Sequence, residues 1–172
     1  MSAGAARLGA HLSHAAGATV ILEDTMTIEA PAQKVWDFLL DVNRSAACVP
    51  GVGEVNMIDD RTFDGTIVAR VGPISGQFAF RAHIVDSKPP TELTALVEGT
   101  DSVTKSTLKM DIGMTLTEVD ANTTTMAHRA VVDIKGRLAI LGDMVLRTTA
   151  VLVLEEFTKR IRAELATDAA TS

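Results

Sequence analysis

The sequence predicts an α+β domain in which a curved antiparallel sheet of about seven strands wraps around one long C-terminal helix, with a short helix after the first strand. Two observations predict this class. Apolar and polar residues alternate over most of residues 20–135, which is typical of strands with one buried face. After Gly136 the alternation stops, and apolar residues recur at helical spacing without a proline.

The first strand is predicted over residues 20–30, where Asp24 interrupts the apolar face. Pro31 then stands where a helix would begin, because a proline in the first turn loses no useful hydrogen bond. Residues 43–53, which contain Pro50 and two glycines, predict a loop that ends this helix. The side chains expected to be buried on this strand and helix are Val20, Leu22, Met26, Ile28, Val35, Trp36, Phe38, Leu39 and Leu40.

Further alternating segments predict strands that follow in quick succession. The turns between them carry residues that turns favour: Gly72 with Pro73, the pair Pro89 and Pro90, and residues 118–122. In each segment the apolar residues share one face of the sheet. The predicted inward-facing residues are Phe63, Ile67, Ala69, Val71, Phe78, Phe80, Ala82, Ile84, Leu93, Ala95, Val97, Leu108, Met110, Ile112, Met114, Leu116, Met126, His128, Ala130, Val132 and Ile134.

Residues 138–165 predict one helix of roughly 25 residues, near ~40 Å in length at ~1.5 Å per residue. An antiparallel sheet with one polar face needs its apolar face covered, and this helix is the only predicted element able to cover it. The sequence therefore predicts a helix-grip arrangement. A cavity is expected where the twisted sheet and the helix meet incompletely.

The chain length of 172 residues fits a single domain. Residues 1–18 are rich in alanine and glycine and predict a flexible N-terminal extension. The helix-grip ligand-binding domain is predicted over residues 19–166, and residues 167–172 are predicted as a disordered tail.

Composition argues against several classes of function. The formal net charge is -6 and no basic run is present, which argues against a nucleic-acid partner. Cys48 is the only cysteine and cannot form an internal disulfide, so we expect a cytoplasmic, reducing location. No stretch reaches the roughly 18–20 apolar residues of a membrane span, which leaves peripheral contact with the inner face of the cytoplasmic membrane as the membrane hypothesis.

Methionine is prominent on the predicted inner face. Its flexible, polarisable side chain suits a surface that fits a variable apolar guest, although it also fills irregular gaps in cores. Strand alternation turns His128 inward, either as a polar anchor for a ligand carbonyl or hydroxyl or as a core histidine bonded to a neighbour. The candidate ligand-binding residues are Met26, Phe80, Met110, Met114, Met126, His128 and Met144.

Motifs for catalysis or metal binding are missing from the sequence. It has no nucleophile elbow, no His-x-x-x-His or Cys-x-x-Cys spacing, and no glycine-rich phosphate loop after a strand. We therefore expect no catalytic residue, no metal and no tightly bound cofactor. Asp24 or His128 could in principle move a proton in a pocket, which keeps an enzyme as an alternative.

Three segments of the sequence resemble a known family. They are Cys48-Val49-Pro50-Gly51, Val71-Gly72-Pro73-Ile74-Ser75-Gly76 and Gly136-Arg137-Leu138-Ala139-Ile140-Leu141-Gly142. In this order and spacing they resemble the G-subunit family of carbon monoxide dehydrogenase. Residues 28–36 are similar to the opening of START/Bet v 1-like lipid-transfer and polyketide cyclase domains. The resemblance implies a helix-grip fold and a non-catalytic accessory role beside a molybdenum hydroxylase of the carbon monoxide dehydrogenase type.

Three functions follow as hypotheses. The first is a carrier or adaptor that binds a lipid or quinone in the apolar cavity and aids membrane association or electron transfer to the membrane. The second is a polyketide cyclase-like enzyme or a lipid-transfer protein of the same superfamily. The third is a structural adaptor that contacts its partner enzyme through the outer face of the sheet or a loop. The candidate partner or membrane contacts in that loop are Cys48, Val49, Pro50 and Val52, although Cys48 could instead be a small buried hydrophobic residue.

Overall fold

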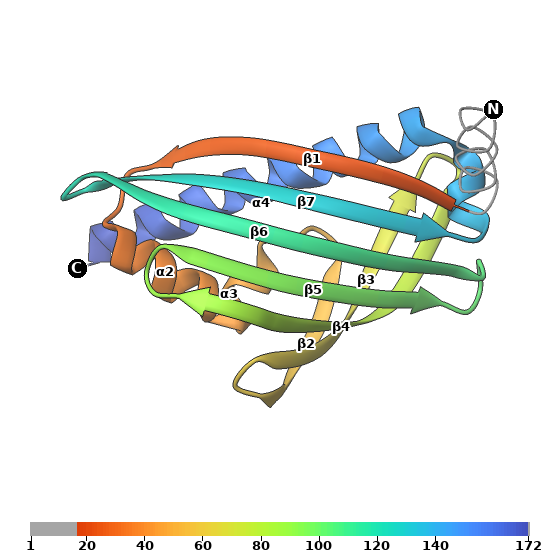
Figure 1. Cartoon of the computed structure of the whole chain (residues 1–172), viewed down its shortest axis with the longest axis horizontal. Helices are drawn as coiled ribbons and strands as arrows, with labels where there is room; N and C mark the ends of the chain where they lie inside the picture. Colours follow the sequence, from red (N-terminus) through yellow and green to blue (C-terminus); the bar gives the residue numbers. More distant parts are fainter. Residues whose placement is uncertain (1–16, 172) are drawn as a thin grey trace, which may run out of the picture.

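Seven strands form one antiparallel sheet in the computed structural model, which describes residues 17–171, with side chains described to residue 167 (Figure 1). Their order is β1-β7-β6-β5-β4-β3-β2, so the first strand pairs with the last. The α+β class predicted from the sequence is confirmed. The strands are β1 (Gly17–Ile28), β2 (Val52–Asp59), β3 (Thr62–Val71), β4 (Ile74–Lys88), β5 (Glu92–Asp101), β6 (Ser106–Asp120) and β7 (Thr123–Lys135); the helices are α2 (Ala32–Leu40), α3 (Val42–Ala47), the 3-10 helix η1 (Arg137–Leu141) and α4 (Asp143–Thr171).

Helix α4 lies behind the sheet in Figure 1 and runs along β1, to which two arginines attach it. The Arg147 guanidinium donates to the Ile21 carbonyl at 3.1 Å, and the Arg162 guanidinium donates to the Thr27 carbonyl at 3.2 Å. An edge strand presents backbone carbonyls that need donors, and these side chains supply them. The helix therefore covers the β1 side of the sheet.

The segment after β1 begins as predicted and then departs from the prediction. Pro31 precedes α2, and the predicted Val35 and Trp36 are buried on it. Residues 43–47, predicted as a loop, form most of α3, because the turn-forming proline and glycines of this segment lie beyond it. Strand β2 was also not predicted, since it is an edge strand with mostly exposed residues and no clear alternation.

The C-terminal helix differs from its prediction at both ends. Gly142, with a φ of 90°, separates η1 from α4, so residues 138–165 do not form one continuous helix. Glycine adopts this φ without strain, which allows the chain to turn there. At the other end α4 reaches Thr171, so residues 167–171 are helical rather than a disordered tail. Strand β1 begins at Gly17, and the rest of the predicted extension lies outside the described residues.

Buried side chains form two clusters, one toward each end of α4. The α2-end cluster lies where α2 and the C-terminal half of α4 meet the sheet, and the η1-end cluster lies beside η1. The α2-end cluster comprises Met26, Ile28, Ala30, Val35, Trp36, Phe38, Cys48, Leu116, Met126, Ile161 and Leu165; the η1-end cluster comprises Ala18, Val20, Val71, Phe78, Ala130, Val132, Ile134, Leu138 and Leu146.

A buried polar network closes the η1 end of the sheet. The Asp101 carboxylate accepts hydrogen bonds from the Thr104 hydroxyl at 2.9 Å and from the Gln77 N–H at 3.2 Å. The Ser106 hydroxyl accepts one from the Leu138 N–H at 3.1 Å. Burial raises the pKa of Asp101, but the hydrogen bonds it accepts outweigh this and lower the pKa overall. The network ties β4, the β5–β6 turn and η1 together.

Candidate ligand-binding groove

The inner face of the sheet is incompletely covered between the two clusters. Its residues in the middle of β3 to β6 face the same side as the core, yet they are half-buried. Part of each of these side chains therefore remains accessible to solvent, and we call this partly exposed inner surface the inner groove. The sheet residues that line the inner groove are Ile67, Ile84, Leu93, Ala95, Val97, Met110, Ile112 and Met114.

The residues of α4 and of the sheet explain why the inner groove is only partly covered. Between Leu146 and Ile161 no residue of the helix is buried as a whole, although both ends of this stretch pack on the sheet. Below this stretch the sheet carries the small residues Ala95 and Ala130 on its inner face. The apolar side chains of the groove pack against the rims of the two clusters and stay partly exposed between them.

Two polar side chains lie in the interior without a hydrogen-bond partner. Within the described residues, the buried side-chain atoms of this kind are Nδ1 and Nε2 of His128 and Oγ1 of Thr158. His128 lies on β7 opposite Asp24 of β1 and Met114 of β6. Burial lowers the pKa of His128, and the Asp24 carboxylate opposes this only in part, so the imidazole is neutral at pH 7. Thr158 was not predicted as a site residue, because helical spacing does not distinguish it from a surface threonine.

The predicted methionines divide between the inner groove and the closed core. Met110 and Met114 line the inner groove. Met26 and Met126 belong to the α2-end cluster, and Met126 is only 1% exposed. These two methionines fill the core, which is the alternative role that the sequence left open for this residue type.

Phe80 and Met144 lie away from these methionines. The half-buried Phe80 ring lies over Gly65, where an added Cβ would come within 2.7 Å of it, and meets the Phe63 ring edge-on at 6.3 Å. Met144 is 82% exposed at the start of α4. It lines a separate apolar cleft between α4 and the end of β3, and the buried position in this first turn belongs to Leu146.

The loop predicted as a partner or membrane contact is less exposed than expected. Cys48 is 2% exposed, and its Sγ donates to the Arg44 carbonyl at 3.6 Å. Burial raises the pKa of the Cys48 thiol. Of the two interpretations left open for Cys48, the structure agrees with a buried hydrophobic residue and contradicts a surface contact. Val49, Pro50 and Val52 are half-buried.

An apolar cleft of about 730 Å³ lies between α4 and the end of β3. Pro50 reaches it from the loop before β2, Gly72 from the β3–β4 turn, and Val145 from the first turn of α4. Leu152, which is exposed, lines its helical side. The cleft thus joins elements that carry or adjoin the three segments singled out in the sequence. Their meeting could not be predicted from spacing, because they are far apart along the chain.

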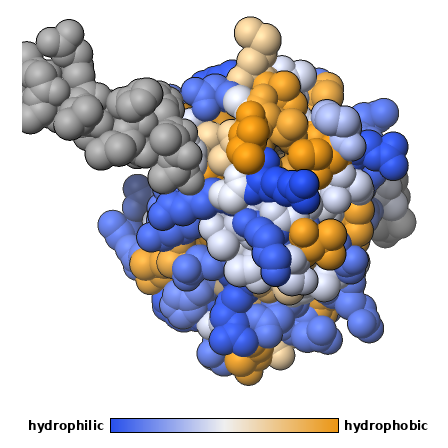
Figure 2. All heavy atoms as spheres, turned by 90° about the vertical axis from the view of Figure 1, so that its right-hand side faces the viewer, coloured by the Kyte–Doolittle hydropathy of each residue, from blue (hydrophilic) through white to orange (hydrophobic). Residues whose placement is uncertain are grey.

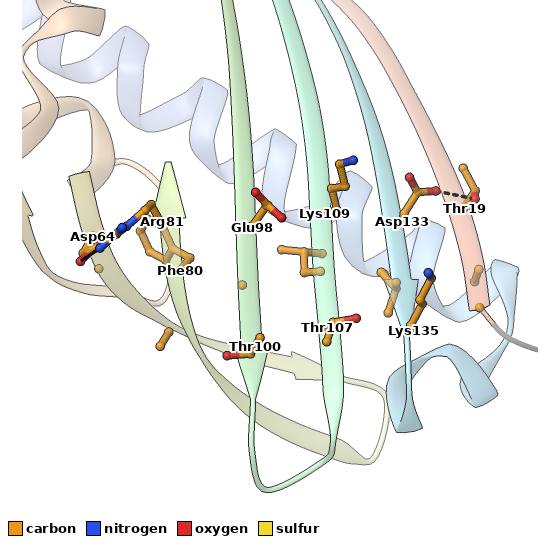
Figure 3. Close-up of a pocket in the computed structure, with 17 residues that line it drawn as sticks. Thr19, Asp64, Phe80, Arg81, Glu98, Thr100, Thr107, Lys109, Asp133 and Lys135 are labelled. Carbon is orange, nitrogen blue, oxygen red and sulfur yellow. Dashed lines mark hydrogen bonds and ion pairs between the residues drawn. The ribbon is translucent and has the colours of Figure 1, made fainter. Parts of the chain in front are cut away.

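A polar hollow of about 1110 Å³ lies on the outer face of the sheet, opposite α4 (Figure 3). Arg81 donates two hydrogen bonds to the Asp64 carboxylate, at 2.7 and 3.0 Å, and these lower the pKa of that carboxyl. Charged groups would lose hydration beneath an apolar guest, so this hollow does not suit a hydrophobic ligand. A row of alternating charges crosses it: Asp133, Lys109, Glu98, Arg81 and Asp64.

The end of the molecule that carries η1 exposes hydrophobic side chains among hydrophilic ones (Figure 2). Val103 in the β5–β6 turn, Ile140 in η1 and Met144 at the start of α4 are all largely exposed. Lys105 and Arg137, from the same turn and helix, are exposed as well. These five residues form what we call the η1-end surface. Apolar tips with basic neighbours are typical of surfaces that touch membranes or partners.

Residues 25–166 match the family model for the G subunit of carbon monoxide dehydrogenase (CoxG). The chain belongs to the CoxG family. This confirms the resemblance carried by the three sequence segments and associates the chain, through its family, with carbon monoxide dehydrogenase. No curated protein matches the sequence of this CoxG-family chain.

Solved structures share the fold of the CoxG-family chain at low sequence identity. A conserved protein from Geobacillus kaustophilus has a TM-score of 0.80 and 20% identity, covering 86% of this chain and 96% of that one. A START superfamily protein from Mycobacterium smegmatis has a TM-score of 0.63 and 11% identity, covering 86% and 97%. The Zhui aromatase/cyclase from Streptomyces sp. R1128 has a TM-score of 0.62 and 17% identity, covering 86% and 93%. These similarities confirm the START/Bet v 1-like fold and show the fold alone.

The described part of the CoxG-family chain offers no arrangement for a metal. Among its His, Cys, Asp and Glu side chains, no three or more are grouped as metal ligands. None of the described helices combines the length and hydrophobicity needed to cross a membrane. The inner groove and the apolar cleft have apolar linings and are the candidate places for an apolar guest.

Proposed function

We propose that this CoxG-family protein is a non-catalytic accessory protein of a molybdenum carbon monoxide dehydrogenase-type oxidoreductase. It binds a hydrophobic molecule, a lipid or a quinone, in the inner groove. The observation that carries the proposal is the incomplete cover of Met110, Ile112 and Met114 beneath α4. Removing apolar surface from water yields roughly 25 cal/mol per Å², so an apolar guest over these residues is favourable. The family supplies the choice of partner enzyme.

An enzyme of the cyclase kind receives less support from the same site. A histidine that transfers protons is usually oriented by a hydrogen bond to its second ring nitrogen, and neither nitrogen of His128 has one. Asp24, the other predicted proton carrier, is exposed on β1 and accepts a hydrogen bond from the Thr25 N–H at 2.8 Å. The similarity to an aromatase/cyclase extends to the fold and supports no reaction.

The test is to identify the guest. Protein purified without detergent is analysed by native mass spectrometry and by solvent extraction, and we expect one apolar molecule per chain. Ala130→Phe adds a ring where the η1-end cluster borders the inner groove, beside Ile112, and should remove that molecule. Ala79→Phe, on the exposed outer face, is the matched control and should retain it. Equal occupancy in two variants that both keep the native circular dichroism spectrum would contradict the proposal.

Peripheral contact with the cytoplasmic membrane is the second part of the proposal, and the η1-end surface supports it. Val103, Ile140 and Met144 are free to enter the headgroup region, and Lys105 and Arg137 are placed to meet anionic lipid. The loop around Val49 offers less exposed apolar area than this surface does, because its apolar residues are half-buried.

Liposome flotation with phosphatidylglycerol vesicles, at low and at high salt, tests this membrane contact. The triple variant Val103→Ser, Ile140→Ser, Met144→Ser should lose flotation at both salt concentrations. Val119→Ser, at an exposed position near the end of β6, is the control and should float like the unmodified protein. If the unmodified protein does not float, the membrane part of the proposal is wrong and the ligand part stands separately.

A further inference from the structure

The interior of the protein keeps two polar groups that its own structure does not satisfy. Buried polar atoms normally have hydrogen-bond partners, and those that lack one call for an explanation. The other buried polar side chains follow the rule: Thr124 donates to the Ala30 carbonyl at 2.7 Å, and Thr104 bonds to Asp101. Among the described side chains, the ring nitrogens of His128 and the hydroxyl of Thr158 are the exceptions.

Thr158 differs from other threonines of α4 in the direction of its hydroxyl. The Thr149 hydroxyl donates to the Val145 carbonyl one turn earlier, at 3.0 Å, and the Thr167 hydroxyl donates in the same way to the Ala163 carbonyl. This bond to the helix backbone is the usual fate of a threonine in a helix. The buried Thr158 hydroxyl does not make it, so it remains able to donate to and accept from a guest.

The arginine contacts between α4 and β1 place the two groups at neighbouring levels. From Arg147 to Arg162 the helix advances about 22 Å, and from Ile21 to Thr27 the strand advances about 20 Å. Asp24 lies midway along this stretch of strand, and His128 is its partner on β7. Thr158 lies within about one helical turn of the midpoint between Arg147 and Arg162. Helical side chains lean toward the N-terminus of their helix, and this brings the Thr158 side chain closer to the level of His128.

The charges around this point restrict the kind of head group that can bind. No lysine or arginine is buried among the described residues, so the interior offers no cation to a carboxylate. Asp24, on the same cross-strand row as His128, adds a negative charge nearby. An anionic group would lose its hydration and meet repulsion there. A neutral imidazole and a hydroxyl instead offer both donors and acceptors.

We propose that His128 and Thr158 together bind the uncharged head of the groove ligand, a carbonyl or a hydroxyl group. The apolar body of that ligand lies over Met110 and Ile112. The site thereby selects neutral lipophilic molecules over those with a carboxylate head, such as fatty acids. This inference rests on the proposed function, because it names the ligand class of the same groove.

Displacement of Nile red, a neutral dye, by probes of one chain length tests the selection. The probes are an alkane, its primary alcohol, its methyl ketone, its carboxylate and its primary amine. We expect the alcohol and the ketone to bind about tenfold more tightly than the alkane and the carboxylate, the factor of one net hydrogen bond. Thr158→Val and His128→Leu should each abolish most of that advantage and leave alkane binding unchanged. Thr158→Ser should preserve the advantage.

The thermal stability of ligand-free Thr158→Val provides a readout that does not depend on binding. The substitution replaces an unsatisfied buried hydroxyl by a methyl group of similar shape, so the Tm should rise. A fall in Tm would show that the hydroxyl already has a partner and would overturn the inference.

The outcomes separate this inference from the proposed function. If the carboxylate or the amine binds most tightly, or if the advantage of the alcohol survives both substitutions, the inference is wrong and the hydrophobic carrier remains. If no probe displaces the dye and no guest is extracted from the native protein, both are wrong.

Discussion

Met126 and Met114 face the same side of the sheet, one cross-strand row apart, yet they have different environments. Met126, in the α2-end cluster, is 1% exposed, whereas Met114 lines the inner groove and is half-buried. Residues of α2 and α4 enclose Met126 at the α2 end, whereas Met114 packs against the edge of that cluster. Methionine is thus part of a buried core at position 126 and part of a partly exposed candidate binding surface at position 114.

This difference indicates that stability and ligand binding are divided between regions of one sheet. The α2-end and η1-end clusters hold α4 at its two ends, and the stretch between them carries the half-buried residues and the unsatisfied polar atoms. The two buried clusters can therefore keep the positions of the sheet and α4 when no ligand occupies the inner groove. The following substitutions test the division, beginning with the largest expected effect.

Met126→Ala should lower the free energy of unfolding by about 2–5 kcal/mol, because it leaves a cavity in a fully enclosed site. Urea denaturation followed by the fluorescence of Trp36, which belongs to the same cluster, measures the change. A loss no larger than that of Met114→Ala would break the comparison between the two regions.

Asp101→Asn should destabilise the protein at neutral pH, because the amide replaces a carboxylate that accepts several hydrogen bonds. The folded-state pKa of Asp101 is lowered, so the ionised carboxyl contributes stability above the ordinary aspartate pKa. This contribution is lost as the pH falls through the lowered pKa. The difference in Tm between the protein and the variant should therefore shrink in acid. A difference that stays constant with pH would contradict the role given to the ionised carboxylate.

Met114→Ala should lower the free energy of unfolding by only about 1 kcal/mol, since its side chain is already partly in contact with water. Its larger effect is expected on ligand affinity, measured by displacement of the same neutral dye. A variant that loses as much stability as Met126→Ala would show that the inner groove is closed in solution.

Leu152→Ser should change the free energy of unfolding by less than about 0.5 kcal/mol, because the side chain is exposed on α4. Thermal denaturation checks this, with Leu146→Ser as the buried counterpart on the same helix. A marked loss of stability for Leu152→Ser would mean that the apolar cleft closes over that side chain in solution.

Sequence patterns were sufficient for the regular parts of this fold. Period-two alternation predicted β7 together with the inward direction of His128, and proline and glycine positions predicted where α2 begins. The patterns did not predict β2, which is an edge strand, or the turn at Gly142. For edge strands and helix breaks, local preference is weak and the neighbouring elements decide the conformation.

The candidate site was predicted only in part. Met110, Met114 and His128 follow from alternation alone, because each strand residue faces one of two sides. Thr158 and the exposure of Met144 do not, because a helix position has no fixed partner until the helix is docked. The assignment of Cys48 to the surface was wrong for the same reason: α2, α3 and α4 together bury it.

The sequence by itself determined the α+β class, the CoxG family and the face on which each inner residue of the strands lies. The class, the family and the facing of strand residues depend on local periodicity and on short motifs, which involve residues close together in the sequence. Only the tertiary structure decided which inward residues are enclosed and which remain open. That depends on where α4 rests, and its position is set by the two buried clusters and by the contacts of Arg147 and Arg162 with a strand more than a hundred residues earlier.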